Sequence, residues 1–366
     1  MKLAWFGVEE WLNPMDSLAK INLGSSCVKA FTMDELFKVT GQDEQEFLKD
    51  METMSLHYHH GDATGSPRVK AAVAGIYPKS DVTPDHVMMV HGGTGANNTV
   101  VYTLIEPSDN VISIMPNYQQ YYSIPRSIGA EVREIDLKPE DGYKLNLSEV
   151  RKAVDSNTKA IMLTNPNNPT GSLLELEEMQ ELVAIAKSVD AWIVCDEMYR
   201  GLKKEYMPSM ADLYDKAIVT CSSSKIYSMA GTRCGWIICR DPEVRWELFN
   251  RRSYDSICGG VFDEWIFAIA LEHADKIFER SRNIVEHNKA IVDKWLDGHK
   301  YLHQYADAYG TTYLIHYDLN VGSEKFCDDL LDQKGVLICQ DLEEAKDGVR
   351  TIMEDKKFGT AGNTMV

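Results

Sequence analysis

Short apolar runs separated by helical patterns recur along most of the chain. The runs are rich in β-branched residues, which is typical of strands buried on both faces. They lie at residues 87–90, 110–114, 131–135, 160–163, 191–195, 217–220 and 236–239. Helical periodicity fills many of the gaps, most clearly at 174–188 and 244–252. The alternation predicts an α/β fold, with a mostly parallel sheet flanked by helices.

Both ends of the chain depart from this alternation. Helical runs near 32–38 and 45–53 lie in a mixed N-terminal stretch, and residues 261–295 predict a long helix. Beyond about residue 300, strand patterns at 311–316 and 336–339 indicate a smaller α/β domain. We therefore expect three parts, which are an N-terminal segment (1–55) packed with the small domain, a large domain (56–285) and a small C-terminal domain (286–366).

Composition narrows the class of protein. A chain of 366 residues exceeds one typical domain, and 44% hydrophobic with 26% charged residues is typical of globular proteins. The net charge of −18 argues against nucleic-acid binding, which needs a basic surface. No apolar run approaches the length of a membrane span, and early acidic residues disfavour a secretory signal. The eight cysteines lack metal-site spacing, so we predict reduced thiols, no metal and a cytoplasmic location.

One polar stretch, residues 222–236, carries the strongest chemical signal. Lys225 follows three serines, and Arg233 comes eight residues later among small residues. Hydroxyls and a guanidinium suit a phosphate, because both offer hydrogen-bond donors of the right geometry. A lysine beside such a site could form a Schiff base with a phosphorylated aldehyde. A serine-rich turn with a solvated lysine and arginine is the competing interpretation.

Three further motifs stand beside predicted strands. Asn165-Pro-Asn-Asn-Pro-Thr-Gly171 follows one strand, Asp196-Glu-Met-Tyr199 ends another, and His91-Gly-Gly-Thr-Gly-Ala96 follows a third. Together with the lysine stretch they resemble the class I/II aminotransferases, which are fold-type I pyridoxal-phosphate (PLP) enzymes. The resemblance covers roughly residues 20–340. It implies the fold-type I architecture, pyridoxal 5′-phosphate as cofactor, an L-amino acid and a 2-oxo acid as substrates, and a homodimer.

The resemblance assigns the catalytic residues. Lys225 would carry the Schiff base and, once displaced by substrate, shuttle a proton. Asp196 would face the pyridine nitrogen and keep it protonated, since PLP works as an electron sink. Tyr199 and Asn168 would donate hydrogen bonds to the cofactor's phenolic oxygen. The structural alternatives are a helix cap for Asp196 and an ordinary turn for the Asn-Pro motif.

The same resemblance assigns the remaining cofactor contacts. Ser222 and Arg233 match phosphate contacts, with Ser224 as a weaker addition, and Tyr118 matches the aromatic residue that stacks on the pyridine ring. A core tyrosine is the alternative for Tyr118. A glycine-rich helix start would bring backbone N–H groups to the phosphate, through Gly93, Thr94 and Gly95. The absence of GxGxxG excludes a dinucleotide fingerprint.

The substrate contacts and the chain ends depart from the family pattern. The segment around Gly24 would pass the substrate carboxylate, as would Asn168. Arg350 is the candidate carboxylate anchor, although the loop that usually precedes this arginine is nearly absent. His60 stands where the family often has a tyrosine that reaches the neighbouring subunit's phosphate. We expect His60 to approach the partner's cofactor.

Two other functions stay open at this stage. Residues 24–36 resemble the N-terminal region of the capreomycidine synthases, PLP enzymes that cyclise a hydroxyarginine, so elimination or cyclisation is the alternative within the same cofactor chemistry. A non-catalytic PLP-fold module is the alternative from another class. The sequence does not determine which amino acid is used, because specificity lies in loops that vary freely on one fold.

Overall fold

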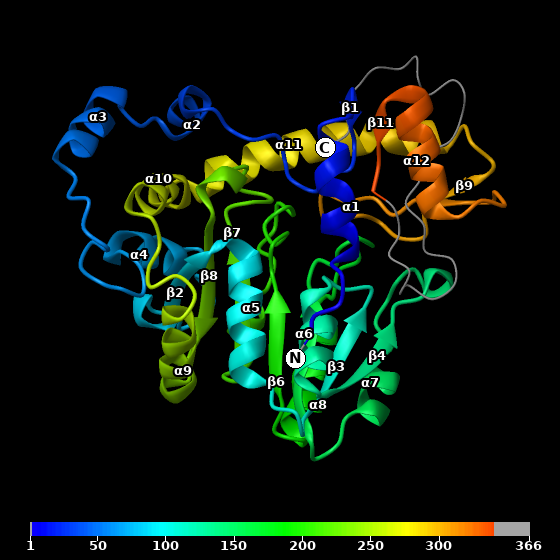
Figure 1. The fold of residues 1–366 in the computed structure, drawn as a ribbon, viewed down its shortest axis with the longest axis horizontal. Helices are drawn as coiled ribbons and strands as arrows, with labels where there is room; N and C mark the ends of the chain where they lie inside the picture. Colours follow the sequence, from blue (N-terminus) through cyan, green and yellow to red (C-terminus); the bar gives the residue numbers. More distant parts are fainter. Residues whose placement is uncertain (1, 340–366) are drawn as a thin grey trace.

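Seven strands form a mixed sheet at the centre of the molecule. The computed structural model describes residues 2–339, and Figure 1 shows the sheet beneath the long helix α11 (Ala274–Leu296). The strand order is β2-β8-β7-β6-β5-β3-β4. Among these seven strands, β8 alone runs in the direction opposite to the others. The predicted mostly parallel sheet is therefore confirmed. The strands are β2 (Val87–His91), β3 (Asn110–Met115), β4 (Glu131–Asp136), β5 (Thr158–Thr164), β6 (Trp192–Asp196), β7 (Ala217–Ser222) and β8 (Cys234–Cys239).

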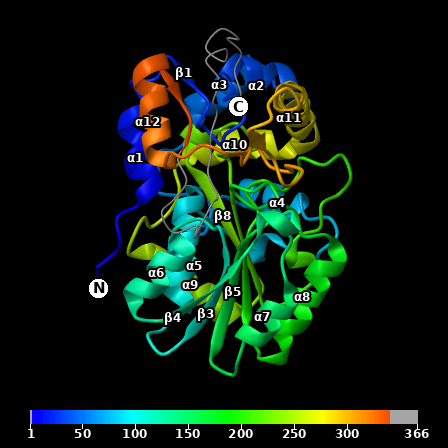
Figure 2. The ribbon, with the colours of Figure 1, turned by 90° about the vertical axis from the view of Figure 1, so that its right-hand side faces the viewer.

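Helices cover both faces of this sheet, as Figure 2 shows edge-on. Successive side chains of a strand point to opposite faces, so Ile193 and Cys195 of β6 join one apolar core while Trp192 and Val194 join the other. Burial on both faces explains why the strands are near-continuous apolar runs. Helices α4 (Pro67–Gly75), α7 (Leu147–Ala153), α8 (Leu176–Ser188) and α10 (Val261–Glu272) supply the first core, and α5 (Gly92–Leu104), α6 (Gln120–Ile128) and α9 (Pro242–Ser253) supply the second.

The parallel strands end together at one edge of the sheet. Thr164 at the end of β5 pairs with Asp196 at the end of β6, which in turn pairs with Thr220 of β7. Helix α5 begins directly after β2, so its N-terminus faces the same edge. Open α/β sheets bind ligands at the carboxyl ends of their strands. The fold therefore places the motif residues on one side of the molecule.

The two ends of the described chain pack against each other. Strand β1 (Ile21–Asn22) pairs in parallel with β11 (Val336–Leu337), and a third apolar core joins Trp11 and Leu23 to the helices and strands beyond α11. The boundaries at residues 55 and 285 stay predictions. The other elements of the two ends are α1 (Gly7–Asp16), α2 (Met33–Thr40), α3 (Glu44–Thr53), β9 (Leu302–His303), β10 (His316–Tyr317) and α12 (Ser323–Lys334).

Three details differ from the sequence-based expectation. The prediction of a single long helix over 261–295 is wrong, because His273 leaves the helical conformation (φ −121°, ψ 33°) and separates α10 from α11. The strand expected at 311–316 is shorter and shifted, since β10 covers His316–Tyr317. Helix α1 was not predicted, and it contains Pro14, a residue that helix interiors rarely tolerate.

Candidate active site

A cavity of about 530 Å³ lies at the carboxyl edge of the sheet. Most of the residues that the motifs predict line it, although they come from separate strands and loops. These lining residues are Gly24, Gly93, Thr94, Tyr118, Asn168, Asp196, Tyr199, Ser222, Ser224, Lys225 and Arg233. The fold thus brings the predicted catalytic, cofactor and substrate groups into one concave site.

Lys225 projects its amine into this cavity. Its Nζ donates a hydrogen bond to Ser26 Oγ at 2.6 Å. Burial lowers the pKa of this amine, but nearby acidic groups, first Tyr199 and Cys27, outweigh burial and leave the pKa above its usual value. The amine is therefore held as a cation here. No individual role was predicted for Ser26. The one local feature that could have indicated a role is its position at the end of the Gly/Ser-rich segment around Gly24.

Asp196 ends β6 with its side chain buried at 4% exposure. Burial raises the pKa of this carboxyl to about 6, while hydrogen bonds from the Met198 backbone N–H (3.0 Å) and the Asn97 amide (3.3 Å) oppose the shift. Tyr121 Oη donates to Asn97 Oδ1 at 2.8 Å and so orients that amide. A cation opposite Asp196 would favour the ionised carboxylate over the protonated carboxyl. Asn97 is a positioning residue that the motifs did not reveal.

Tyr199 supplies a hydroxyl without a partner. The residue is 2% exposed, and within residues 2–339 its hydroxyl oxygen has no hydrogen bond. Buried polar groups are normally paired, and an orphan in a cavity indicates a missing ligand. The predicted acceptor, a cofactor phenolic oxygen, fits this hydroxyl, and Asn168 lines the same cavity.

The expected phosphate cradle is closely packed. A Cβ added to Gly93, the second residue of α5, would lie 2.0 Å from Met198 Cε, so the end of the Met198 side chain would have to move to admit it. Ser222 is buried beside this point, and its hydroxyl donates to Met198 Sδ at 3.1 Å. Arg233 holds a left-handed backbone (φ 53°), an uncommon conformation for a non-glycine residue, and its carbonyl accepts from Gly92 N at 2.7 Å. Hydroxyl, guanidinium and helix N-terminus converge as a phosphate requires.

Tyr118 closes one side of the cavity. Its hydroxyl donates to Glu9 Oε1 at 2.9 Å, and its ring packs against Phe6 with centroids 5.3 Å apart. Burial raises the pKa of this phenol, and the charge of Glu9 raises it further. Helix α1 therefore covers the ring that is expected to stack on the cofactor.

Two predicted residues do not line this cavity, and a third is not described. Gly95 is not among the described residues that line it. His60 also lies outside it, and its Nε2 is 2.8 Å from the carbonyl oxygen of Ser55. Arg350 lies outside the described residues. Their roles stay predictions.

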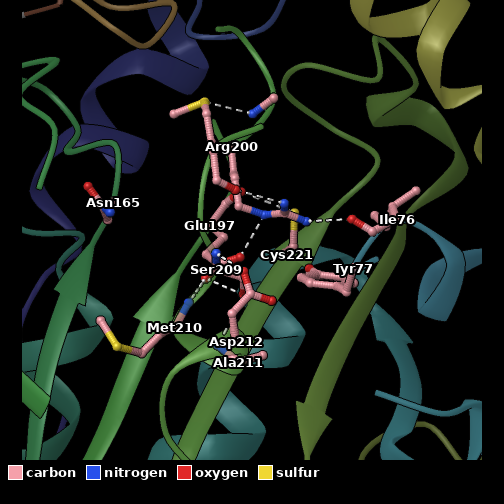
Figure 3. Close-up of polar contacts among 12 residues, drawn as sticks. Ile76, Tyr77, Asn165, Glu197, Arg200, Ser209, Met210, Ala211, Asp212 and Cys221 are labelled. Carbon is pink, nitrogen blue, oxygen red and sulfur yellow. Dashed lines mark hydrogen bonds and ion pairs between the residues drawn. The ribbon is translucent and has the colours of Figure 1, made fainter. Parts of the chain in front are cut away.

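A buried ion pair, drawn in Figure 3, joins Glu197, the residue that follows Asp196 in the sequence, to Arg200. Glu197 Oε2 is 2.8 Å from Arg200 Nε, and Glu197 Oε1 accepts from Ser209 Oγ and Met210 N, both at 2.8 Å. Burial raises the pKa of Glu197 to about 7, and the Arg200 charge opposes that shift. Arg200 also lies 4.3 Å over the ring of Tyr77. This network ties the loop after β6 to the core and so fixes the direction of Asp196 and Tyr199.

Residues 2–339 contain no group of three or more His, Cys, Asp or Glu side chains arranged to hold a metal ion. Within the same residues, every helix is too short or too polar to cross a membrane.

Comparison with known proteins identifies the family. The profile of the family "Aminotransferase class I and II" matches residues 19–340. This chain belongs to that family. The resemblance inferred from the motifs is therefore confirmed, and the cofactor of the family's chemistry, pyridoxal phosphate, is the cofactor of this chain.

Individual relatives refine this picture. A PLP-dependent aminotransferase from Streptococcus suis 89-1591 is 38% identical, with a TM-score of 0.90 over 96% of this chain and 93% of that one. Capreomycidine synthase from Streptomyces vinaceus is 26% identical over 90% of this chain and 84% of its own length. The PLP-dependent cyclase OrfR, 19% identical, shares the fold with a TM-score of 0.81 over 92% of this chain and 88% of that one. The family and the predicted fold class are thus confirmed, and this chain resembles both an aminotransferase and a capreomycidine synthase.

Proposed function

We propose that this chain is an aminotransferase that exchanges an amino group between an L-amino acid and a 2-oxo acid. The observation that carries the proposal is the meeting of Lys225, Asp196 and the unpartnered hydroxyl of Tyr199 in one cavity. When bound, pyridoxal phosphate supplies an electron-accepting ring that stabilises negative charge at the substrate's Cα. The protein's own residues hold and orient the cofactor and the substrate, and they hold or move the protons.

Each residue has a definite task in this proposal. Lys225 Nζ holds the cofactor covalently at rest, and its freed amine then moves a proton at the substrate's Cα. The Asp196 carboxylate keeps a proton on the pyridine nitrogen, because an opposite charge favours the protonated ring. Tyr199 and Asn168 donate hydrogen bonds to the phenolic oxygen. The phosphate is held by Ser222, Ser224, Arg233 and the backbone of Gly93, Thr94 and Gly95.

The substrate carboxylate needs its own contacts. We propose that the segment at Gly24 and the Asn168 amide lie along it, since both line the cavity. Arg350 is the proposed anchor, because a guanidinium binds a carboxylate in two parallel hydrogen bonds. Arg350→Ala should raise the KM for the amino donor, and an unchanged KM would exclude this role.

We also propose a homodimer. Exposed apolar side chains gather on two adjoining segments, Tyr58 on one and Tyr254, Ile257 and Phe262 on the other, and Cys258 Sγ donates to the carbonyl of Tyr58. Such a patch on both copies can form a self-complementary interface. His60 belongs to the same region and would then reach the partner's cofactor. A monomer in light scattering at working concentration would contradict this proposal. The cytoplasm stays our prediction for the location.

One experiment separates transamination from the second candidate. The similarity to capreomycidine synthase over most of both chains favours cyclisation or elimination as that candidate. Purified enzyme is given amino acids with and without a 2-oxo acid acceptor, and the products are identified by mass spectrometry. A new amino acid that forms only with the acceptor supports transamination. A cyclised or shortened product without acceptor supports the lyase or cyclase, and failure to bind pyridoxal phosphate at all would favour a non-catalytic protein.

A further inference from the structure

Helix α1 places an acidic side chain, Glu9, in the wall of the active-site cavity. Its Oε1 accepts the hydrogen bond from Tyr118 at 2.9 Å, and across residues 2–339 its carboxylate forms no ion pair. A second carboxylate of the same helix, Asp16, also lines the cavity and accepts a hydrogen bond from Asn22. Two carboxylates of α1 therefore belong to the wall of the cavity.

The position of Glu9 is fixed from both sides. At the start of α1, Gly7 N donates to Gln119 Oε1 at 3.0 Å, and Gln119 Nε2 donates to the carbonyl of Trp5 at 2.7 Å. Two residues after Glu9, Trp11 Nε1 donates to Asp328 of α12 at 3.2 Å. Figure 1 and Figure 2 both show α1 beside α12. Glu9 is thus a held carboxylate rather than a freely moving surface acid.

The described cations of this cavity already have other tasks. Lys225 and Arg233 line it, and the proposed function assigns them to the cofactor. The charge of Glu9 nevertheless acts in the same space, since it is one of the groups that raise the pKa of Lys225. The same cavity takes a ligand, since the Tyr199 hydroxyl, 2% exposed and assigned above to the cofactor, has no hydrogen-bond partner within residues 2–339. A partly buried carboxylate without a cation is best completed by a cation that the ligand brings.

We propose that Glu9 selects amino donors whose side chain ends in a cation, either an ω-amino or a guanidino group. The inference rests on the proposed aminotransferase function and specifies its substrate class. A neutral side chain of the same shape leaves the Glu9 carboxylate desolvated and unpaired, and an acidic one is repelled by it. Discrimination by one charged hydrogen bond is on the order of tenfold to a hundredfold.

Pairs of amino donors with similar shape but different side-chain charge test the proposal. The kcat/KM of the holoenzyme is measured for L-arginine against L-citrulline, which replaces the guanidino group by a neutral ureido group of similar shape, and for L-lysine against L-norleucine. We expect the cationic donor of each pair to be preferred by about tenfold or more. Glu9→Gln should remove this preference by slowing the cationic donors, while the neutral donors stay within about threefold. Glu10→Gln, at the exposed neighbouring position, is the control and should keep the preference.

A binding measurement keeps the inference separate from turnover. α-Methyl-L-ornithine and α-methyl-L-norvaline lack the α-proton, so no proton transfer at Cα can follow and calorimetry reports their binding to the holoenzyme without turnover. The proposal is supported if Glu9→Gln weakens the binding of α-methyl-L-ornithine and leaves that of α-methyl-L-norvaline unchanged. Equal affinity of the wild type for the two compounds would overturn the proposal. An equal loss of kcat/KM for all donors in Glu9→Gln would also overturn it, because it would mean that Glu9 only positions Tyr118. If no donor of any class transfers its amino group, the aminotransferase function fails, and the calorimetry still decides the role of Glu9.

Discussion

The floor and the roof of the cavity are built in different ways. The floor consists of strand ends and the turns that follow them, and it holds Asp196, Ser222 and Lys225 on a sheet buried on both faces. The roof comes from α1 and from residues 311–315, which belong to the ends of the described chain. Cofactor chemistry needs fixed geometry, whereas substrate choice needs a surface that can change without disturbing that geometry. We therefore propose that the floor carries the cofactor chemistry and that the roof decides the choice of substrate.

Removing the floor's lysine should have the largest effect. Lys225→Ala is expected to lower turnover by at least about a thousandfold, since it removes both the covalent attachment and the proton carrier. Cofactor binding should survive in part, because the phosphate and ring contacts remain. Single-turnover kinetics and dialysis measure the two effects. Lys204→Ala, at an exposed position, is the control, and normal turnover by Lys225→Ala would remove the assignment.

Neutralising the floor's carboxylate comes next. Asp196→Asn keeps the shape of the side chain but cannot hold a pyridinium proton by charge. On the order of 3 kcal/mol or more of transition-state stabilisation should be lost, which is about a hundredfold in kcat. Steady-state kinetics with circular dichroism as a folding check provide the measurement. A loss below roughly tenfold would mean that Asp196 is a structural cap.

The same substitution should have the opposite effect on the empty protein. Burial raises the pKa of Asp196 to about 6, so the protonated form stabilises the fold. That contribution is full below about pH 4 and is lost as the pH rises through about 6. Without cofactor, Asp196→Asn should therefore be more stable than the wild type near pH 7.5, by up to about 3 kcal/mol, and similar to it near pH 4. Urea denaturation of both proteins at the two pH values tests this, and a pH-independent difference would refute it.

The smallest effect should come from a residue outside this chain's own cavity. His60→Ala is expected to weaken cofactor binding by about threefold to tenfold, the value of one ordinary hydrogen bond made by a partly exposed side chain. The visible absorption of the bound cofactor should stay unchanged, because His60 would touch the phosphate and not the ring. His57→Ala, at a nearby exposed position, is the control. Equal affinity of His60→Ala and the wild type would exclude the cross-subunit contact.

The sequence predicted the floor well, for a physical reason. Strands buried on both faces must be apolar along their whole length, so polar residues such as Asp196 stand out where a strand ends. Lys225 and Arg233 are short-range neighbours in the chain, and their spacing is visible without the fold. The sheet and most of the cavity lining followed from these local signals.

The roof was not predicted, because its signals are weak or long-range. Helix α1 contains Pro14, and nothing local indicates that Glu9 turns toward Tyr118, which is more than one hundred positions away in the chain. Asn97 reaches Asp196 only through the fold, since the two side chains come from different elements. The break at His273 likewise depends on packing rather than on a glycine or proline. Contacts of this kind are decided by tertiary structure.

The pairing of β1 with β11 has a consequence for synthesis on the ribosome. Ile21 emerges early but its partner, Val336, is made 336 − 21 = 315 residues later. At about 5–20 residues per second, the first segment waits roughly fifteen seconds to one minute for that partner. During this interval the large sheet can form, because all its strands lie before residue 240. The cofactor floor is thus complete in the nascent chain before the roof can close over it.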